Sequence, residues 1–178
     1  YTEIKRFDWI RGDVVGGRSL LWARQSYRLS DLDFEANAQD GHGVDWPIRY
    51  KDLAPWYDYV ENFIGVSGQA EGIAHLPDSR FQPPMEMNCV EKDFRARVKQ
   101  NYPDRFVTIG RTANLTQPVK GRGQCQNRDL CHRGCPYGAY FSTNASTLPA
   151  AFATGNLTLR PHSLVNKVIY DDHKGRAN

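Results

Sequence analysis

The feature that most constrains this chain is a run of three cysteines, CQNRDLCHRGCP, which places Cys125, Cys131 and Cys135 in one loop. A disulfide between thiols so close in sequence would close a very small ring and stabilise the fold little. A tetrahedral zinc site needs four ligands, and because His132 directly follows Cys131, both side chains reach one ion only awkwardly. The thiols are explained better by another metal chemistry, or as buried residues without a ligand.

The end of this run, Cys-x3-Cys-Pro, matches the end of the bacterial ferredoxin pattern. In that pattern thiolates hold an iron–sulfur cluster and the proline turns the chain away. Three thiols suit a three-iron cluster, or a four-iron cluster with one ligand from elsewhere. Cys89 begins a separate predicted helix, and His132 is interpreted as a bystander. The spacing therefore predicts Cys125, Cys131 and Cys135 as cluster ligands.

A second motif is the double glycine in VVGGRSLLWARQSYRL. Gly16 and Gly17 permit a positive φ and let the backbone approach a ligand closely. Residues 18–27 can open a helix after them, and the N–H groups at a helix start suit a phosphate or an electron-rich ring. Because the G-x-G-x-x-G pattern is missing, the pair by itself is more typical of a tight turn.

Length and charge exclude some classes of protein. A chain of 178 residues can form one domain or two small ones. Its formal charge of +3 is spread along the chain, which argues against a nucleic-acid partner. No apolar run is long enough to predict a transmembrane segment. The sequence begins without Met, and we expect it to be a segment of a longer polypeptide.

Apolar residues at helical spacing predict helices over residues 52–64 and 89–104 and a short helix within 144–155. Residues 105–117 read as a strand, and residues 156–172 read as two strands of alternating polarity. A Lys-Gly hairpin signal follows the last strand, and its return strand is expected to be missing.

The order of these motifs resembles the glucose–methanol–choline (GMC) FAD oxidoreductases, in particular the bacterial sugar and gluconate dehydrogenases. The stretches that carry the resemblance are VVGGRSLLWARQSYRLSDLDF, DWPIRYKDLAPWYDYVENFIGVSG and CQNRDLCHRGCPYGAYFSTNASTLPAAFATGNLTLRPHSLVNKVIYDDHKGRA. The implied fold class is α/β, a fragment of a Rossmann-like FAD-binding domain with a helical connecting or lid region. The full-length protein would add an antiparallel substrate domain.

The resemblance divides the chain into three parts and implies roles for single residues. Residues 1–30 would carry the flavin-contacting loop, residues 31–110 the connecting region, and residues 111–178 the cysteine loop and strands returning to the FAD domain. Leu21 stands where some members attach FAD through a histidine, so non-covalent FAD is expected. The implied FAD contacts are Gly16, Gly17, Arg18, Ser19, Trp22 and Ala23, with Val165 at the adenine edge.

The activity implied by the resemblance is oxidation of a sugar or polyol alcohol by hydride transfer to FAD. Electrons would then pass through a [3Fe–4S] cluster on the three cysteines to an acceptor subunit or a cytochrome. The family's catalytic histidine pair and its βαβ fingerprint match nothing in this chain, so the chain alone is expected to be inactive. The compartment, periplasmic or cytoplasmic, stays open.

Two other functions remain open at this point. One is an oxygen-using flavin oxidase of the same family, whose cysteines carry no metal. The other is a non-catalytic binding module stabilised by zinc or by disulfides. Iron content separates the dehydrogenase from the oxidase, and thiol titration with metal analysis separates both from the binding module.

Overall fold

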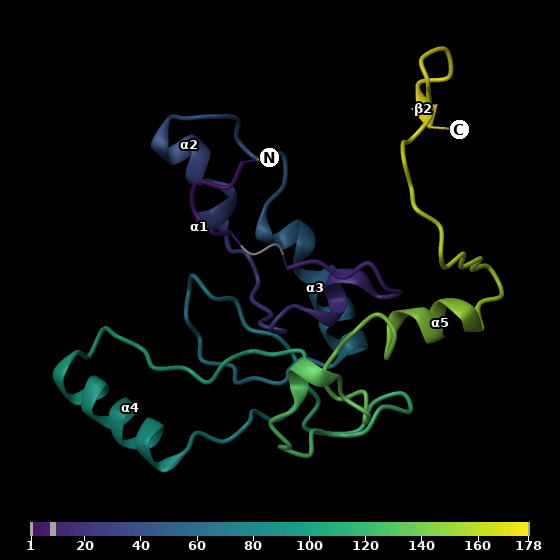
Figure 1. Cartoon of the computed structure of the whole chain (residues 1–178). Helices are drawn as coiled ribbons and strands as arrows, with labels where there is room; N and C mark the ends of the chain where they lie inside the picture. Colours follow the sequence, from purple (N-terminus) through teal and green to yellow (C-terminus); the bar gives the residue numbers. More distant parts are fainter. Residues whose placement is uncertain (1, 8–9, 178) are drawn as a thin grey trace.

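The computed structural model describes residues 2–7 and 10–177, and helices and loops dominate it (Figure 1). The helical elements are η1 (Gly17–Leu20), α1 (Asp31–Phe34), α2 (Ala36–Asp40), α3 (Tyr50–Ile64), α4 (Cys89–Asn101), η2 (Cys131–Arg133) and α5 (Thr147–Ala153). The strands β1 (Tyr170–Asp171) and β2 (Arg176–Ala177) pair antiparallel. None of the helices in the described residues has the length and apolarity to cross a membrane.

The two long predicted helices are confirmed, with bounds set by their caps. α3 begins at Tyr50, two residues before the predicted start, because the Asp52 carboxylate accepts a hydrogen bond from the Arg49 N–H at 2.8 Å. It ends at Gly65, whose φ is 77°. α4 begins after Asn88, whose side chain accepts from the Val90 and Glu91 N–H groups, and it ends at Asn101.

The strand predicted over residues 105–117 is wrong. Four segments and Gln82 lie side by side near the centre of the molecule, but each pairs with its neighbours at single residues. Residues 111–115 bond in turn to residues 24–26, to Ser67 and to residues 139–141, so no pair of segments runs together long enough to form a ladder. The bridged pairs are Gln25–Thr112, Ser67–Thr112, Ser67–Gln82, Asn114–Tyr140 and Val119–Arg122.

The hydrophobic core is small and lies on this bridged region. Val66, Ala113 and Phe141 are buried together, and three half-buried side chains pack against them: Trp22, Ile64 and Phe81. The edge of the Trp22 ring meets Phe141 with 5.9 Å between the ring centroids. The core therefore joins the segment after the double glycine to the segment after the cysteine run.

The carboxyl-terminal segment leaves this body after α5 and ends in the β1–β2 hairpin (Figure 1). Residues 156–169 are not in strands, because a strand needs a neighbour for its backbone groups. Leu164 and Val165 are 98% and 81% exposed. The expectation that the return strand is missing is wrong as well, since Arg176–Ala177 pairs with Tyr170–Asp171.

Candidate functional site

The double glycine forms a tight turn that leads into a short 3-10 helix. Gly16 and Gly17 have φ of 102° and 48°, in the region that favours glycine. The helix predicted from residues 18–27 stops after Leu20, because the chain turns at Arg24, whose φ is 63°. Ser19 stays within the turn and donates its hydroxyl to the Gly16 carbonyl at 2.6 Å. The double glycine therefore lies in a compact, hydrogen-bonded turn.

This turn is fastened to the segment that follows the cysteine run. The hydroxyls of Ser19 and Thr143 share a hydrogen bond of 2.9 Å, and the Thr143 N–H donates to the Ser19 hydroxyl at 3.1 Å. The Asn144 amide donates to the Val15 carbonyl at 3.0 Å. A Cβ on Gly16 would lie 2.6 Å from the Asn144 Oδ1. The position therefore needs glycine for both its φ and its close neighbour.

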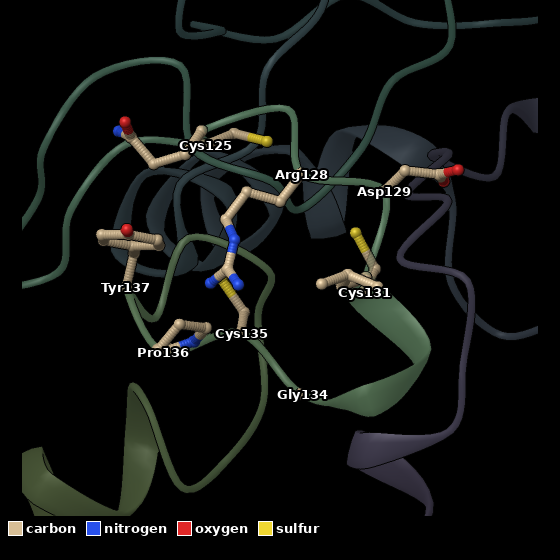
Figure 2. Close-up of a pocket in the computed structure, with 10 residues that line it drawn as sticks. Cys125, Arg128, Asp129, Cys131, Gly134, Cys135, Pro136 and Tyr137 are labelled. Atoms are coloured by element: carbon tan, nitrogen blue, oxygen red, sulfur yellow. The ribbon is translucent and has the colours of Figure 1, made fainter.

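The three cysteines of the run line a single pocket (Figure 2). All are free thiols of intermediate exposure, and the Arg128 side chain lines the same pocket. Burial raises the pKa of the Cys131 thiol, and Cys125, Cys135 and Asp129 raise it further. Within residues 2–7 and 10–177, no three His, Cys, Asp or Glu side chains are gathered so that they could hold a metal ion.

The pocket adjoins two clefts that also reach the double-glycine loop. One cleft, of about 260 Å³, is lined by Leu20, Leu21 and Arg24 from one side and by Cys131 and Cys135 from the other. The second cleft, of about 340 Å³, adds Trp22, Ala23 and Asp129. His132, interpreted from the sequence as a bystander to the thiols, lines both clefts. Two motifs more than a hundred residues apart thus face one another.

Sequence reasoning missed two buried arginines: Arg24, which lines both clefts, and Arg122. Their exposed fractions are 4% and 6%. Arg122 donates to the Gly138 carbonyl at 2.8 Å and to the Ile64 carbonyl at 2.6 Å. Neither arginine forms an ion pair with a carboxylate of the described chain. A basic residue in a loop is normally solvated, so the sequence carries no signal that separates these two from the other arginines.

The remaining predicted contact, Val165, lies apart from the others. It sits in the extended carboxyl-terminal segment, is largely exposed, and lines none of the clefts described above. The structure therefore brings residues 20–23 to the cysteine loop, and it does not bring Val165 to them.

The residues present fit the two expected cofactors to different degrees. The larger cleft is lined by Leu20, Leu21, Trp22 and Ala23, with the Arg24 cation beside them, and this mostly apolar wall with one positive charge suits the ring system of FAD. The cysteine loop supplies the donor type of an iron–sulfur cluster, three unpaired thiols on one pocket. It does not hold them in a ligand geometry.

Comparison with known proteins places the chain in a family. The GMC oxidoreductase profile, that of the amino-terminal FAD-binding domain, matches residues 2–178. The chain is 29% identical over 131 residues to the fructose dehydrogenase large subunit of Gluconobacter japonicus, covering 72% of this chain and 24% of that protein. It is 27% identical over 165 residues to 2-methyl-1,2-propanediol dehydrogenase of Mycolicibacterium austroafricanum, and the match covers 86% of this chain and 28% of that protein. Paromamine 6'-oxidase of Streptomyces fradiae is 31% identical to it over 153 residues, and the match covers 82% of this chain and 26% of that protein.

The chain belongs to the GMC oxidoreductase family. The resemblance drawn from the ordered motifs is thereby confirmed. The chain spans about a quarter of the length of these curated relatives. The relatives include both dehydrogenases and oxidases by name, so family membership alone does not choose the electron acceptor.

Proposed function

We propose that this chain is the flavin-loop part of an FAD-dependent dehydrogenase that oxidises a sugar or polyol alcohol. When bound, FAD would supply the two-electron acceptor for the hydride of the carbinol carbon. No residue of this chain is assigned as the base for the hydroxyl proton. The observation that carries the proposal is a cleft wall formed by residues 20–23, directly after a glycine turn that is fastened to Thr143 and Asn144, in a chain of this family.

Each residue of the loop has a part in this proposal. Gly16 and Gly17 let the backbone approach the cofactor, and Ser19 holds the turn through Gly16 and Thr143. Arg18 is exposed and free to face a phosphate, while Trp22 and Ala23 line the cleft in which the ring system would lie. Leu21 cannot form a covalent bond to FAD. Val165 would reach the adenine edge only in the full-length fold.

We further propose that Cys125, Cys131 and Cys135 carry an iron–sulfur cluster that takes electrons from the flavin to an acceptor subunit or cytochrome. Two observations support this role: the three thiols share one pocket, and that pocket adjoins the clefts lined by the flavin loop. The name of one relative, a dehydrogenase large subunit, also suits a protein that works with further subunits. Binding of the cluster requires the cysteine loop to bring the three sulfur atoms closer together.

The flavin proposal is tested by Gly16→Ala in the full-length protein. The new Cβ meets Asn144 and the backbone is strained, which costs about 1–3 kcal/mol. We expect FAD to dissociate roughly tenfold more readily, measured by flavin absorbance after gel filtration. Gly121→Ala is the matched control, because Gly121 has φ of 80° but nothing within 4 Å of an added Cβ. Equal flavin loss in both variants would count against the loop as the FAD contact.

The cluster proposal is tested by iron and acid-labile sulfide analysis of the full-length protein and of Cys131→Ser. We expect about three irons per chain in the wild type and a large loss in the variant. Cys89→Ser is the control, since Cys89 is exposed on α4 and lies outside the pocket. Active wild-type enzyme without iron would favour an oxygen-using oxidase. Zinc or disulfides without flavin would favour a binding module.

A further inference from the structure

Arg24 lies between the double-glycine loop and the segment that follows the cysteine run, and it bonds to both. Its guanidinium donates to the Phe141 carbonyl at 2.7 Å and to the Ser19 carbonyl at 3.0 Å. It also donates to the carbonyls of Leu20 and Trp22. The side chain therefore ties three carbonyls of the flavin loop to the segment that follows the cysteine run, and it spans them with the fixed fork of a guanidinium.

Two further observations separate Arg24 from an ordinary packing residue. Its φ of 63° lies in the left-handed region, which costs free energy in a non-glycine residue and is a common property of functional sites. Its charge is buried against the faces of aromatic rings, 3.8 Å from the Tyr140 centroid, with no carboxylate of the described chain in an ion pair with it. A buried charge without a counter-charge is costly and needs a compensating reason.

We propose that Arg24 is a positioning residue for the flavin. It sets the shape of the loop from Ser19 to Trp22, and its positive charge, which has no carboxylate partner in the described chain, lies at the cleft that this loop lines. A positive charge there favours the added negative charge of the reduced cofactor. Arg24 thus couples loop geometry to reduction potential. The inference rests on the proposed function, since it needs FAD in this cleft.

The test uses the full-length holoenzyme with Arg24→Met, Arg24→Lys and Arg122→Met. Arg122 is the matched control: it is equally buried and bonded to carbonyls, but it does not touch the flavin loop. For Arg24→Met we expect roughly tenfold weaker FAD retention, an altered visible spectrum and a more negative midpoint potential. Arg24→Lys should keep most of the potential and lose loop geometry, because an ammonium cannot span the same carbonyls.

The outcomes separate this inference from the proposed function. If Arg24→Met keeps wild-type flavin retention, spectrum and potential, or changes them no more than Arg122→Met, the positioning role is overturned. If Arg24→Met does not fold, Arg24→Lys decides in the same way through its spectrum and retention. Wild-type protein that binds no flavin overturns the proposed function itself, and that result is read before any variant is made.

Discussion

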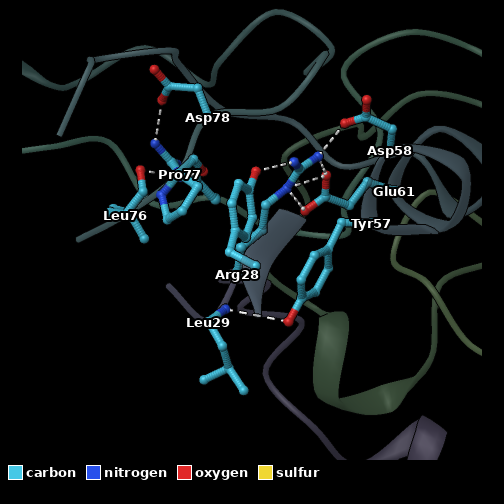
Figure 3. Close-up of polar contacts among 10 residues, drawn as sticks. Arg28, Leu29, Tyr57, Asp58, Glu61, Leu76, Pro77 and Asp78 are labelled. Carbon is cyan, nitrogen blue, oxygen red and sulfur yellow. Dashed lines mark hydrogen bonds and ion pairs between the residues drawn. The ribbon is translucent and has the colours of Figure 1, made fainter. Parts of the chain in front are cut away.

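Arg24 and Arg28 lie four residues apart, and both are buried, but they have opposite partners. Arg28 donates to the Glu61 carboxylate at 3.1 and 3.0 Å and pairs with Asp58 on α3 (Figure 3). It also donates to the Tyr50 hydroxyl at 2.8 Å. Arg24 instead donates to backbone carbonyls and lies over the Tyr140 ring, and no carboxylate of the described residues pairs with it. One arginine is neutralised, and the other leaves its charge unbalanced.

This difference separates an arginine that stabilises the fold from one that lies at the candidate site. The Arg28 contacts fasten α3 to the amino-terminal segment and are complete within the chain. Arg24 lines the clefts between the double-glycine loop and the thiols, without a carboxylate partner among the described residues. Sequence alone would treat the arginines as equivalent.

The largest expected effect comes from Arg28→Met. The change leaves the Glu61 carboxylate buried without its partner, so we expect the free energy of unfolding to fall by about 3–5 kcal/mol. Denaturant unfolding of the full-length protein measures it. Adding Glu61→Leu should restore most of the loss, because an apolar pair needs no counter-charge. A double variant as unstable as the single one would show that packing, and not charge, makes the Arg28 contacts important.

A smaller effect is expected at Asp78, the partner of a fourth buried arginine, Arg111. Burial raises the pKa of Asp78, but the N–H groups of Glu71 and Gly72 and the Arg111 guanidinium outweigh it, so its pKa is lowered. The resulting stability is present above about pH 4, the ordinary pKa, and is lost as the pH falls through the folded pKa. In a plot of the free energy of unfolding against pH, Asp78→Asn should therefore make the decrease at acid pH less steep.

The control for this experiment is Asp104→Asn, at an exposed position outside the Arg111 contact. We expect its decrease at acid pH to match that of the wild type. An unchanged decrease in Asp78→Asn would mean that other carboxylates dominate acid unfolding.

The smallest expected effect has the opposite sign and lies at Glu71. Its Oε2 is buried without a hydrogen-bond partner, and burial raises the pKa of this carboxyl despite Arg95 and Arg111. A raised carboxyl pKa lowers stability as the pH rises from the unfolded pKa through the folded pKa. Glu71→Gln should therefore stabilise the protein by about 1 kcal/mol at pH 7 and by less at pH 4. Destabilisation at pH 7 would show that the Arg95 contact outweighs burial.

Local patterns predicted the long helices because their causes are local. Asp52, Asn88 and Gly65 determine where α3 and α4 begin or end, and each acts within a few residues of its own position. Residues 105–117 and 156–172 have strand-like alternation, but pairing needs a neighbour that the pattern does not name. The first region forms single bridges, and the second stays extended with Val165 exposed.

The sequence by itself determined the family, the glycine turn and the three candidate thiols, since these depend on residue type, order and spacing. The tertiary structure alone decided that residues 20–23 and the thiols line adjoining clefts, and that Arg24 bonds to Phe141 while Arg28 bonds to Glu61. The physical reason is that burial and charge balance depend on what surrounds a side chain. Those surroundings come from other segments, 33 residues away in the case of Glu61 and 117 residues away in the case of Phe141.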